Sequence, residues 1–369
     1  MTRQPLRISV AAALVATLVA FEWPALYAAA AGNAGPQRGK PPGDGGFATF
    51  GNLPSFGHGS EALAVNDAGT VIVGHAWDSQ DILHAVRWTL QGGTWAMTSL
   101  PRPAGSTSAI GRAVNNNGDA AGNDFPAALA HAVLWPASGG FTILNCAADP
   151  GRIAGVYGIS ANAQVAVGNV QYLDENNTIV RAAGSVWAPG QCRQEFPPLV
   201  AGASSSAYAV NGDGTLVGGG ASGVPVRWRL SGGQWLIEQL DTLTGIVLGA
   251  NTIGDMAGQV DVPCGSVNDC ARAEIWYADG GLRQLGTLGG NDSWARDINS
   301  NGEVVGGSTS PRNGNTAYFW SESRGMLQLP FQGRWAAANA LSNVRSDGTR
   351  LVVGMSSSGD ALVWVVRNP

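Results

Sequence analysis

The sequence predicts an all-β fold, a seven-bladed β-propeller made of four-stranded antiparallel blades. Three observations lead to this prediction. A hairpin-like phrase recurs seven times, a Trp follows each copy at a similar distance, and the segment that would complete the last copy lies near the other end of the chain. The composition agrees, because 53 of 369 residues are Gly and only 13% are charged, as expected for many turns between strands that are covered on both faces.

The recurring phrase is clearest at residues 297–307, DINSNGEVVGG. Apolar residues on either side of an Asn and a Gly are typical of two strands joined by a tight turn. In this turn we expect Asn to tolerate the left-handed conformation and Gly to supply a positive φ. The copies lie 40 to 50 residues apart when they are aligned on the Gly that ends each second strand: Gly74, Gly122, Gly168, Gly218, Gly258, Gly306 and Gly354.

Each copy also places a Trp in a later segment, and seven of the thirteen Trp occupy this position: Trp88, Trp135, Trp187, Trp228, Trp276, Trp320 and Trp364. Because neighbouring blades diverge from the central axis, the space between them needs bulky side chains towards the rim and small ones near the axis. We therefore expect the Trp to be core residues. A first-strand position is small in six copies and acidic in one: Ala64, Ala113, Gly158, Ala209, Gly249, Asp297 and Ala340.

The sixth copy contains four predicted strands, at residues 293–299, 303–309, 317–322 and 325–330. Four short antiparallel strands in such a repeat are typical of a propeller blade, whereas an open β-solenoid is the alternative. Closure is favoured because the seventh copy stops after its Trp strand, while residues 46–54, GFATFGNLP, match a fourth strand. The N-terminal segment should therefore complete the last blade and leave no unpaired sheet edge at the seam.

Residues 1–31 form a separate unit, in which Arg3 and Arg7 precede an apolar stretch of about fourteen residues and a run of small residues. This pattern predicts a cleaved export signal. An uncleaved anchor is the alternative, but a spanning helix needs roughly 20 apolar residues. Residues 32–45 are rich in Gly and Pro and should form a flexible linker before the propeller at residues 46–369. We expect a secreted or periplasmic protein with no membrane span in the mature chain.

Export favours disulfides over free thiols. Cys264 and Cys270 bracket a short loop and are expected to pair, whereas Cys146 and Cys192 either form a second bond or remain thiols. Zinc is the alternative at Cys264 and Cys270, but no second pair of ligands with suitable spacing lies nearby. The repeated turns supply mostly amides rather than the carboxylates that Ca²⁺ requires. We therefore predict no metal site and no cofactor.

Three copies carry a similar stretch up to the Trp, namely HAVRW at residues 84–88, HAVLW at residues 131–135 and TAYFW at residues 316–320, and LGTLGG lies at residues 285–290. With these residues the repeat resembles the bacterial extracellular HAF repeat, which is named for a His-Ala-Phe stretch that a Trp follows. LGTLGG is the closest match to the family's phrase. The resemblance covers roughly residues 46–369, and the third and seventh copies depart from it. It implies a secreted protein of β-rich repeats and brings no established reaction.

Loops on one face of the ring are the first candidate binding site. The loops that join second to third strands share this face with the links between blades, and the longest lie at residues 169–184 and 259–272. Variable loops on a rigid scaffold commonly carry function. Aromatic residues of these loops, or of strands beside them, either stack on sugar rings or cover their own loops. They are Trp77, Phe125, Tyr172, Trp294 and Trp335.

The second candidate is a first-strand position that varies where its neighbours are uniform: Leu63, Arg112, Tyr157, Tyr208, Leu248, Arg296 and Asn339. Around a ring, its two guanidinium groups, two phenols and one amide would meet near the mouth of the central tunnel. Such groups suit a carboxylate, a phosphate or a saccharide. The alternative is that these side chains merely bridge adjacent blades by hydrogen bonds.

The sequence singles out no catalytic residues. His84 and His131 occupy equivalent positions in successive copies and are expected to be structural. No GxSxG elbow or glycine-rich phosphate loop precedes a helix, and a net charge of −5 with a single Lys argues against a nucleic-acid partner. We expect a monomeric, non-catalytic binding module for glycan or protein. A propeller glycoside hydrolase or polysaccharide lyase is the alternative.

Overall fold

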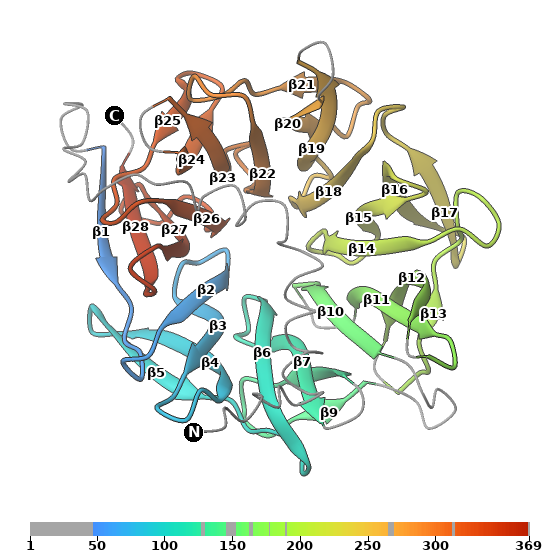
Figure 1. Ribbon diagram of the computed structural model, residues 1–369, viewed down its shortest axis with the longest axis horizontal. Helices are drawn as coiled ribbons and strands as arrows, with labels where there is room; N and C mark the ends of the chain where they lie inside the picture. Colours follow the sequence, from blue (N-terminus) through green and yellow to red (C-terminus); the bar gives the residue numbers. More distant parts are fainter. Residues whose placement is uncertain are drawn as a thin grey trace, which may run out of the picture.

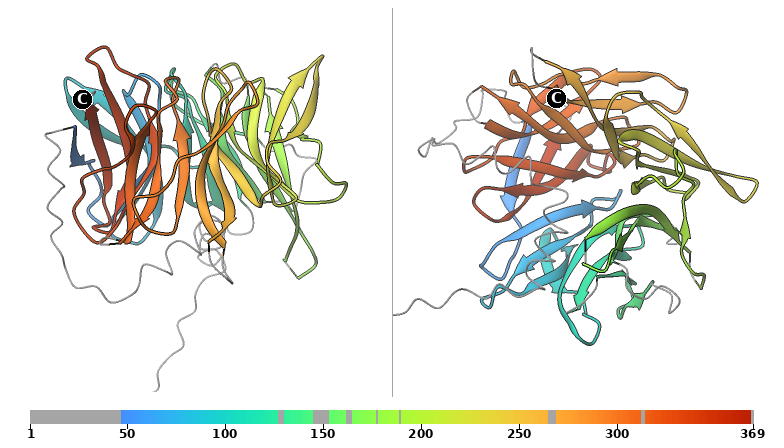
Figure 2. Two further views of the ribbon diagram at one scale, coloured as in Figure 1. Left: turned by 90° about the horizontal axis from the view of Figure 1, so that it is seen from above. Right: turned by 45° about the vertical axis from the view of Figure 1, so that its right-hand side comes forward.

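The computed structural model describes residues 47–126, 130–144, 153–161, 165–176, 178–188, 190–264, 269–311 and 314–367. In this part of the chain, 28 strands form seven four-stranded antiparallel sheets. The sheets follow one another in a ring (Figure 1), and the strands span the depth of the ring (Figure 2). The predicted all-β, seven-bladed propeller is confirmed. The described residues include no helix with the length and apolar character needed to cross a membrane.

The first strand of each blade lies nearest the central axis, and the fourth lies at the rim (Figure 1). Blade 1 contains β2 (Ser60–Val65), β3 (Val71–Trp77), β4 (Leu83–Gln91) and β5 (Thr94–Ser99). Blade 2 contains β6 (Ser106–Val114), β7 (Ala120–Pro126), β8 (His131–Trp135) and β9 (Thr142–Ile143). Blade 3 contains β10 (Ile153–Ile159), β11 (Ala166–Leu173), β12 (Ile179–Trp187) and β13 (Gln194–Glu195). Blade 4 contains β14 (Ser205–Val210), β15 (Leu216–Ala221), β16 (Val224–Ser231) and β17 (Gln234–Gln239).

The remaining blades repeat this order. Blade 5 contains β18 (Gly245–Ala250), β19 (Met256–Pro263), β20 (Asp269–Trp276) and β21 (Leu282–Gln284). Blade 6 contains β22 (Ser293–Ile298), β23 (Val304–Ser310), β24 (Gly314–Ser321) and β25 (Gly325–Gln328), close to the four predicted strands. Blade 7 contains β26 (Ala336–Leu341), β27 (Thr349–Ser356), β28 (Ala361–Arg367) and, from the other end of the chain, β1 (Ala48–Asn52).

Strand β1 closes the ring as the fourth strand of blade 7. It pairs antiparallel with β28, from Ala48 opposite Val366 to Asn52 opposite Leu362. Figure 1 shows β1 on the outer side of β28, between blades 7 and 1. The predicted completion of the last blade by the N-terminal segment is confirmed. The predicted export signal and the predicted linker, residues 1–31 and 32–45, lie outside the described residues.

The recurring Gly follows from a β-bulge in every first strand. At each bulge the register against the second strand shifts by one residue. A Cβ on the Gly opposite the bulge would lie 1.8–2.1 Å from a first-strand carbonyl oxygen in all seven blades, so the close backbone approach requires Gly. The prediction of Gly218 for the fourth copy is wrong by one residue. Gly219 faces Ala207 and meets the Ser206 carbonyl.

The Asn of the repeated turn acts through its side chain rather than through a left-handed backbone. In blade 6, Asn299 Oδ1 accepts hydrogen bonds from the backbone N–H groups of Asn301 and Glu303, both at 3.0 Å, while Gly302 supplies the positive φ of 70°. Among the described residues, Asp81 and Ser222 are the non-glycine residues with positive φ. The predicted role of Gly is therefore confirmed and that of Asn is corrected to a turn-capping role.

The seven recurring Trp are core residues, as predicted, and none is more than 3% exposed. Four of them also donate the indole N–H to the carbonyl of a Pro that follows the fourth strand of the preceding blade. These bonds are Trp88 to Pro54 at 2.7 Å, Trp135 to Pro101 at 2.7 Å, Trp228 to Pro197 at 2.9 Å and Trp364 to Pro330 at 2.6 Å. Each of these four Trp thus fills the space between two blades and also fixes the link that joins them.

The predicted disulfide between Cys264 and Cys270 is present, with the Cα atoms 5.6 Å apart. It closes the loop between β19 and β20. Cys192, in the link between β12 and β13, is disulfide-bonded as well. Cys146 lies outside the described residues.

Candidate functional site

The variable first-strand position coincides with the bulge in every blade. In blade 1, Ala62 pairs with Gly74 and Ala64 pairs with Val73, so Leu63 between them has no partner in the second strand. A bulge of this kind bends the strand and redirects the extra side chain. The same displacement occurs at the other six positions: Arg112, Tyr157, Tyr208, Leu248, Arg296 and Asn339.

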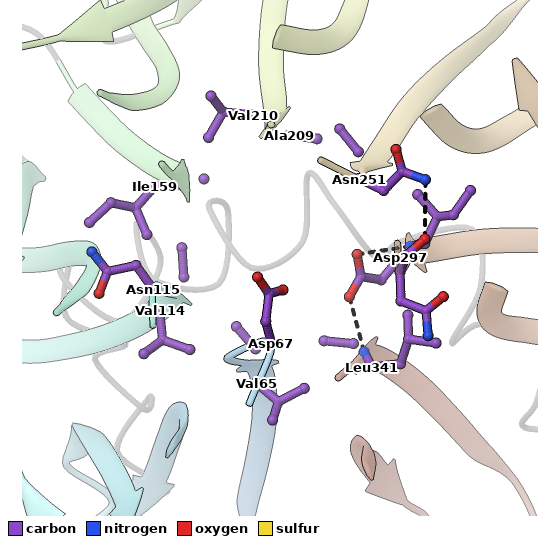
Figure 3. Close-up of a pocket in the computed structure, with 18 of the residues that line it drawn as sticks. Val65, Asp67, Val114, Asn115, Ile159, Ala209, Val210, Asn251, Asp297 and Leu341 are labelled. Atoms are coloured by element: carbon purple, nitrogen blue, oxygen red, sulfur yellow. Dashed lines mark hydrogen bonds between the residues drawn. The ribbon is translucent and has the colours of Figure 1, made fainter. Parts of the chain in front are cut away.

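All seven bulge residues line one pocket. Figure 3 shows this pocket in close-up, between the blades of the ring. The pocket has a volume of about 200 Å³ and extends from the bulges to the Asn-containing turns, where Asp67, Asn116 and Ser300 line it. It therefore reaches the face opposite the long loops. Its volume is below the range of about 300 to 1,000 Å³ that is typical of pockets for drug-sized ligands. A single small molecule, or one end of a larger one, fits such a site.

Arg112, Tyr157 and Tyr208 form a continuous surface across blades 2, 3 and 4. The guanidinium carbon of Arg112 lies 5.0 Å from the centroid of the Tyr157 ring, and the rings of Tyr157 and Tyr208 have centroids 5.0 Å apart with a 40° angle between planes. Arg112 Nε donates to Asn123 Oδ1 at 3.2 Å, and Asn123 Nδ2 donates to the Ala154 carbonyl at 2.7 Å. These contacts hold the three side chains in fixed positions.

Asn339 joins blade 7 to blade 1 at the same level of the pocket. Its Nδ2 donates to Glu61 Oε1 at 3.0 Å and to the Ala62 carbonyl at 2.9 Å. Glu61 Oε2 in turn lies 3.7 Å from Nε2 of the buried His75. Burial, with the positive charge of Arg112, lowers the pKa of His75 to about 3, so this imidazole is neutral at neutral pH. Asn339 thus bridges adjacent blades by hydrogen bonds, as the alternative predicts. Arg112, Tyr157 and Tyr208 contact one another across blades through the guanidinium group and the rings. All four residues also line the pocket.

Asp297 lies in the pocket wall, at the position where the other six blades carry Ala or Gly. Its Oδ1 accepts from the backbone N–H of Ile298 at 2.9 Å, and its Oδ2 accepts from that of Leu341 in blade 7 at 3.0 Å (Figure 3). Burial raises the pKa of Asp297 to about 7, against the opposing effect of these two donors and with a further increase from the charge of Asp67. Asp67 is exposed in the turn of blade 1, where it accepts a hydrogen bond from Asn116 Nδ2 at 2.9 Å.

The aromatic residues of the loop face take part in packing within and between blades. Trp294 is 3% exposed and Phe125 is 2% exposed. Trp77 packs edge-on against the His75 ring, with centroids 4.6 Å apart, and Tyr172 lies under the Arg181 guanidinium at 4.2 Å and bonds to Glu195. Trp335 is partly buried at the start of blade 7, where its carbonyl accepts from Ser357 N. None of these five aromatic residues lines the central pocket.

The two equivalent His each contact an acid of their own blade. His84 Nε2 lies 2.8 Å from Asp78 Oδ2, and His131 Nδ1 lies 3.0 Å from Asp124 Oδ1. Both pairs lie outside the central pocket, which agrees with the structural role predicted for these His. In the described part of the chain, no three His, Cys, Asp or Glu residues are grouped so that they could hold a metal ion.

The sequence did not identify Asp67 and Asp297 as site residues. The sequence did contain a signal for Asp297, because the other six copies have Ala or Gly at this position. A carboxylate among small residues needs hydrogen-bond donors that an Ala does not need. Asp67 carries no comparable signal, since acids are common in exposed turns. Its role depends on the turns of seven blades meeting around one axis, which spacing along the chain does not reveal.

No protein-family model and no curated protein matches this chain. Among solved structures, the β-propeller domain of Cps50 (Swd1) from Myceliophteria thermophila is 13% identical, with a TM-score of 0.51 over 86% of this chain and 98% of that chain. The β-propeller domain of the Trilobed protease from Pyrococcus furiosus is 8% identical, with a TM-score of 0.49 over 83% and 93%. AofleA from Arthrobotrys oligospora is 11% identical, with a TM-score of 0.41 over 78% and 90%. The first similarity supports the propeller fold and, at this identity, nothing beyond the fold.

Proposed function

We propose that this protein is a non-catalytic binding module of the cell exterior, secreted or periplasmic, that binds a glycan or a protein in its central pocket. One observation carries the proposal: residues of variable type from seven blades meet in a single pocket. A propeller repeats similar residues where blades pack, so a first-strand position whose residue type changes from blade to blade suits recognition rather than folding. Rigid strands also position these side chains more precisely than loops do.

Three features support export. The pattern of residues 1–31 is that of a signal sequence, and the repeat resembles the extracellular HAF repeat. The bond between Cys264 and Cys270, with the bonded Cys192, suits an oxidising compartment. We expect a monomer, because the ring leaves no blade incomplete.

The test is a glycan array and a pull-down from exterior extracts, both with the mature protein. The double variant Arg112→Ala/Arg296→Ala should lose at least ten-fold in affinity, because it removes both guanidinium groups of the pocket. The matched control Arg229→Ala/Arg324→Ala removes two exposed Arg from outside the pocket and should bind as the wild type does. Equal binding by the pocket variant and the wild type would contradict the proposal, provided that both fold.

A second candidate is hydrolysis of a glycan, and Asp297 favours it. A carboxyl group with a pKa raised to about 7, with a second carboxylate in the same pocket, is a combination that glycoside hydrolases use. Both oxygens of Asp297 already accept backbone N–H groups, which favours a binding role. Incubation with bound glycans should release no reducing ends. Release that disappears in Asp297→Asn would establish hydrolysis instead.

A further inference from the structure

The acid at position 297 is unusual in its ring of small residues. This ring is crowded, because a Cβ on Gly249 of the neighbouring blade would lie 2.7 Å from the Cα of Asp297. Six blades meet this restriction with Ala or Gly. In blade 6 a carboxylate is present instead, and the N–H groups of Ile298 and Leu341 fix its orientation. Residues that break a structural rule without a gain in packing are concentrated at functional sites.

The wall of the pocket combines hydrogen-bond acceptors, donors and aromatic surface. Figure 3 shows the carboxylates of Asp67 and Asp297 directed into the same space. Each carboxylate oxygen has two acceptor positions, so Asp297 retains acceptor capacity beyond its two backbone bonds. Arg112, Tyr157 and Tyr208 add a cationic and aromatic surface across blades 2 to 4.

The charge and size of the pocket restrict the ligand. The wall carries two Arg, Arg112 and Arg296, and two Asp, Asp67 and Asp297. Above the pKa of Asp297, about 7, both carboxylates are ionised, so the formal charges balance and favour a neutral ligand. A hydroxyl group both donates and accepts hydrogen bonds, which suits a wall of mixed donors and acceptors. The ring faces of sugars pack on aromatic surfaces such as the one formed by Tyr157 and Tyr208. A volume of about 200 Å³ leaves no room for a polysaccharide to pass through.

We propose that the central pocket binds the terminal sugar of a neutral glycan, with Asp297 accepting hydrogen bonds from sugar hydroxyls and the Tyr157–Tyr208 pair packing against the sugar ring. This inference rests on the proposed binding function and specifies its ligand. The glycan enters from the face of the Asn-containing turns, because the pocket reaches that face.

The test is calorimetric titration of the mature protein with methyl glycosides of neutral hexoses, and with glucuronic acid and glucosamine as charged probes. At least one neutral glycoside should bind with one site per chain and should compete with glycans bound on the array. Asp297→Ala, which restores the residue type of the other blades, should weaken this binding at least ten-fold. The control Asp279→Ala changes an exposed turn acid outside the pocket and should leave the binding unchanged.

A second variant keeps the test decisive if Asp297→Ala misfolds. Asp67→Asn changes an exposed turn residue and should weaken binding of the same glycoside while the melting temperature stays unchanged. Binding of the charged probes alone would overturn the inference, as would neutral binding that is insensitive to both variants. If the protein binds glycans on the array and no monosaccharide inhibits this binding, the present inference is overturned and the proposed function stands. Absence of any glycan or protein ligand would overturn both.

Discussion

Gly306 shows how the bulge determines a single residue. A Cβ at this position would lie 2.0 Å from the carbonyl oxygen of Trp294, a backbone atom of β22 that the pairing with β23 holds in place. Gly306→Ala should lower the free energy of unfolding by about 1 to 3 kcal/mol, the usual range for overpacking. Gly51 in β1 is a matched control, since a Cβ there would meet nothing within 4 Å. Urea unfolding should place Gly51→Ala within about 0.5 kcal/mol of the wild type; equal losses for both variants would contradict the close approach.

Asp297 should make stability depend on pH. Its pKa is raised in the folded protein from 3.8 to about 7, mainly by burial. Between these values the unfolded chain is ionised while the folded chain retains the proton, so this residue lowers stability as the pH rises and its effect is constant above about pH 7. Relative to the wild type, Asp297→Ala should therefore gain up to about 4 kcal/mol between about pH 4 and pH 7, at about 1.4 kcal/mol for each pKa unit. Parallel unfolding curves for the two proteins over this range would contradict the raised pKa.

Strand β24 carries the Trp that fills the space between blades 5 and 6. Trp320 is 3% exposed, and the Arg283 guanidinium carbon of blade 5 lies 5.4 Å from its ring. Trp320→Ala should lower the free energy of unfolding by about 3 to 5 kcal/mol, as for other buried aromatic residues. Leu282→Ala in β21 is the control, because Leu282 is 57% exposed and should lose little. A loss below about 1 kcal/mol for Trp320→Ala, measured by denaturant unfolding, would contradict a core role.

The strands were predictable because Gly and Trp recur along the chain at matching intervals. Packing needs Gly opposite the bulge and Trp between the blades, so both types stay at fixed positions in the repeat. In the fourth copy the predicted Gly was wrong by one residue, because three Gly stand in a row at residues 218–220. Sequence alone does not show which of the three faces the bulge. The capping role of Asn was missed because the same residue types suit a left-handed turn and a side-chain cap. The bulge itself was not predicted, although the variable position marked it. The residues that meet in the pocket were predicted as a group, whereas their contacts depend on geometry that sequence does not contain.

The seven bulge residues form one site because the ring of blades is closed. Blades 1 and 7 are far apart in sequence, yet Asn339 bonds to Glu61 and Ala62 across the seam. Strand β1 secures this seam by pairing with β28, and Leu53 N donates to the Ala361 carbonyl at 2.9 Å just beyond it. Loss of this pairing would leave β28 as an exposed edge and would separate the walls of the pocket. Both the fold and the proposed binding function therefore depend on closure.

Closure is tested most directly by a disulfide across the seam. Thr49 and Val365 face each other in β1 and β28, at a separation that antiparallel partners share with natural disulfides. In the mature protein, Thr49→Cys with Val365→Cys should form an intramolecular bond in nearly every chain, seen as faster non-reducing gel migration, and should raise the melting temperature. Each single variant should form no such bond. Free thiols at both positions, or bonds only between different chains, would contradict the closed ring and with it the shared pocket.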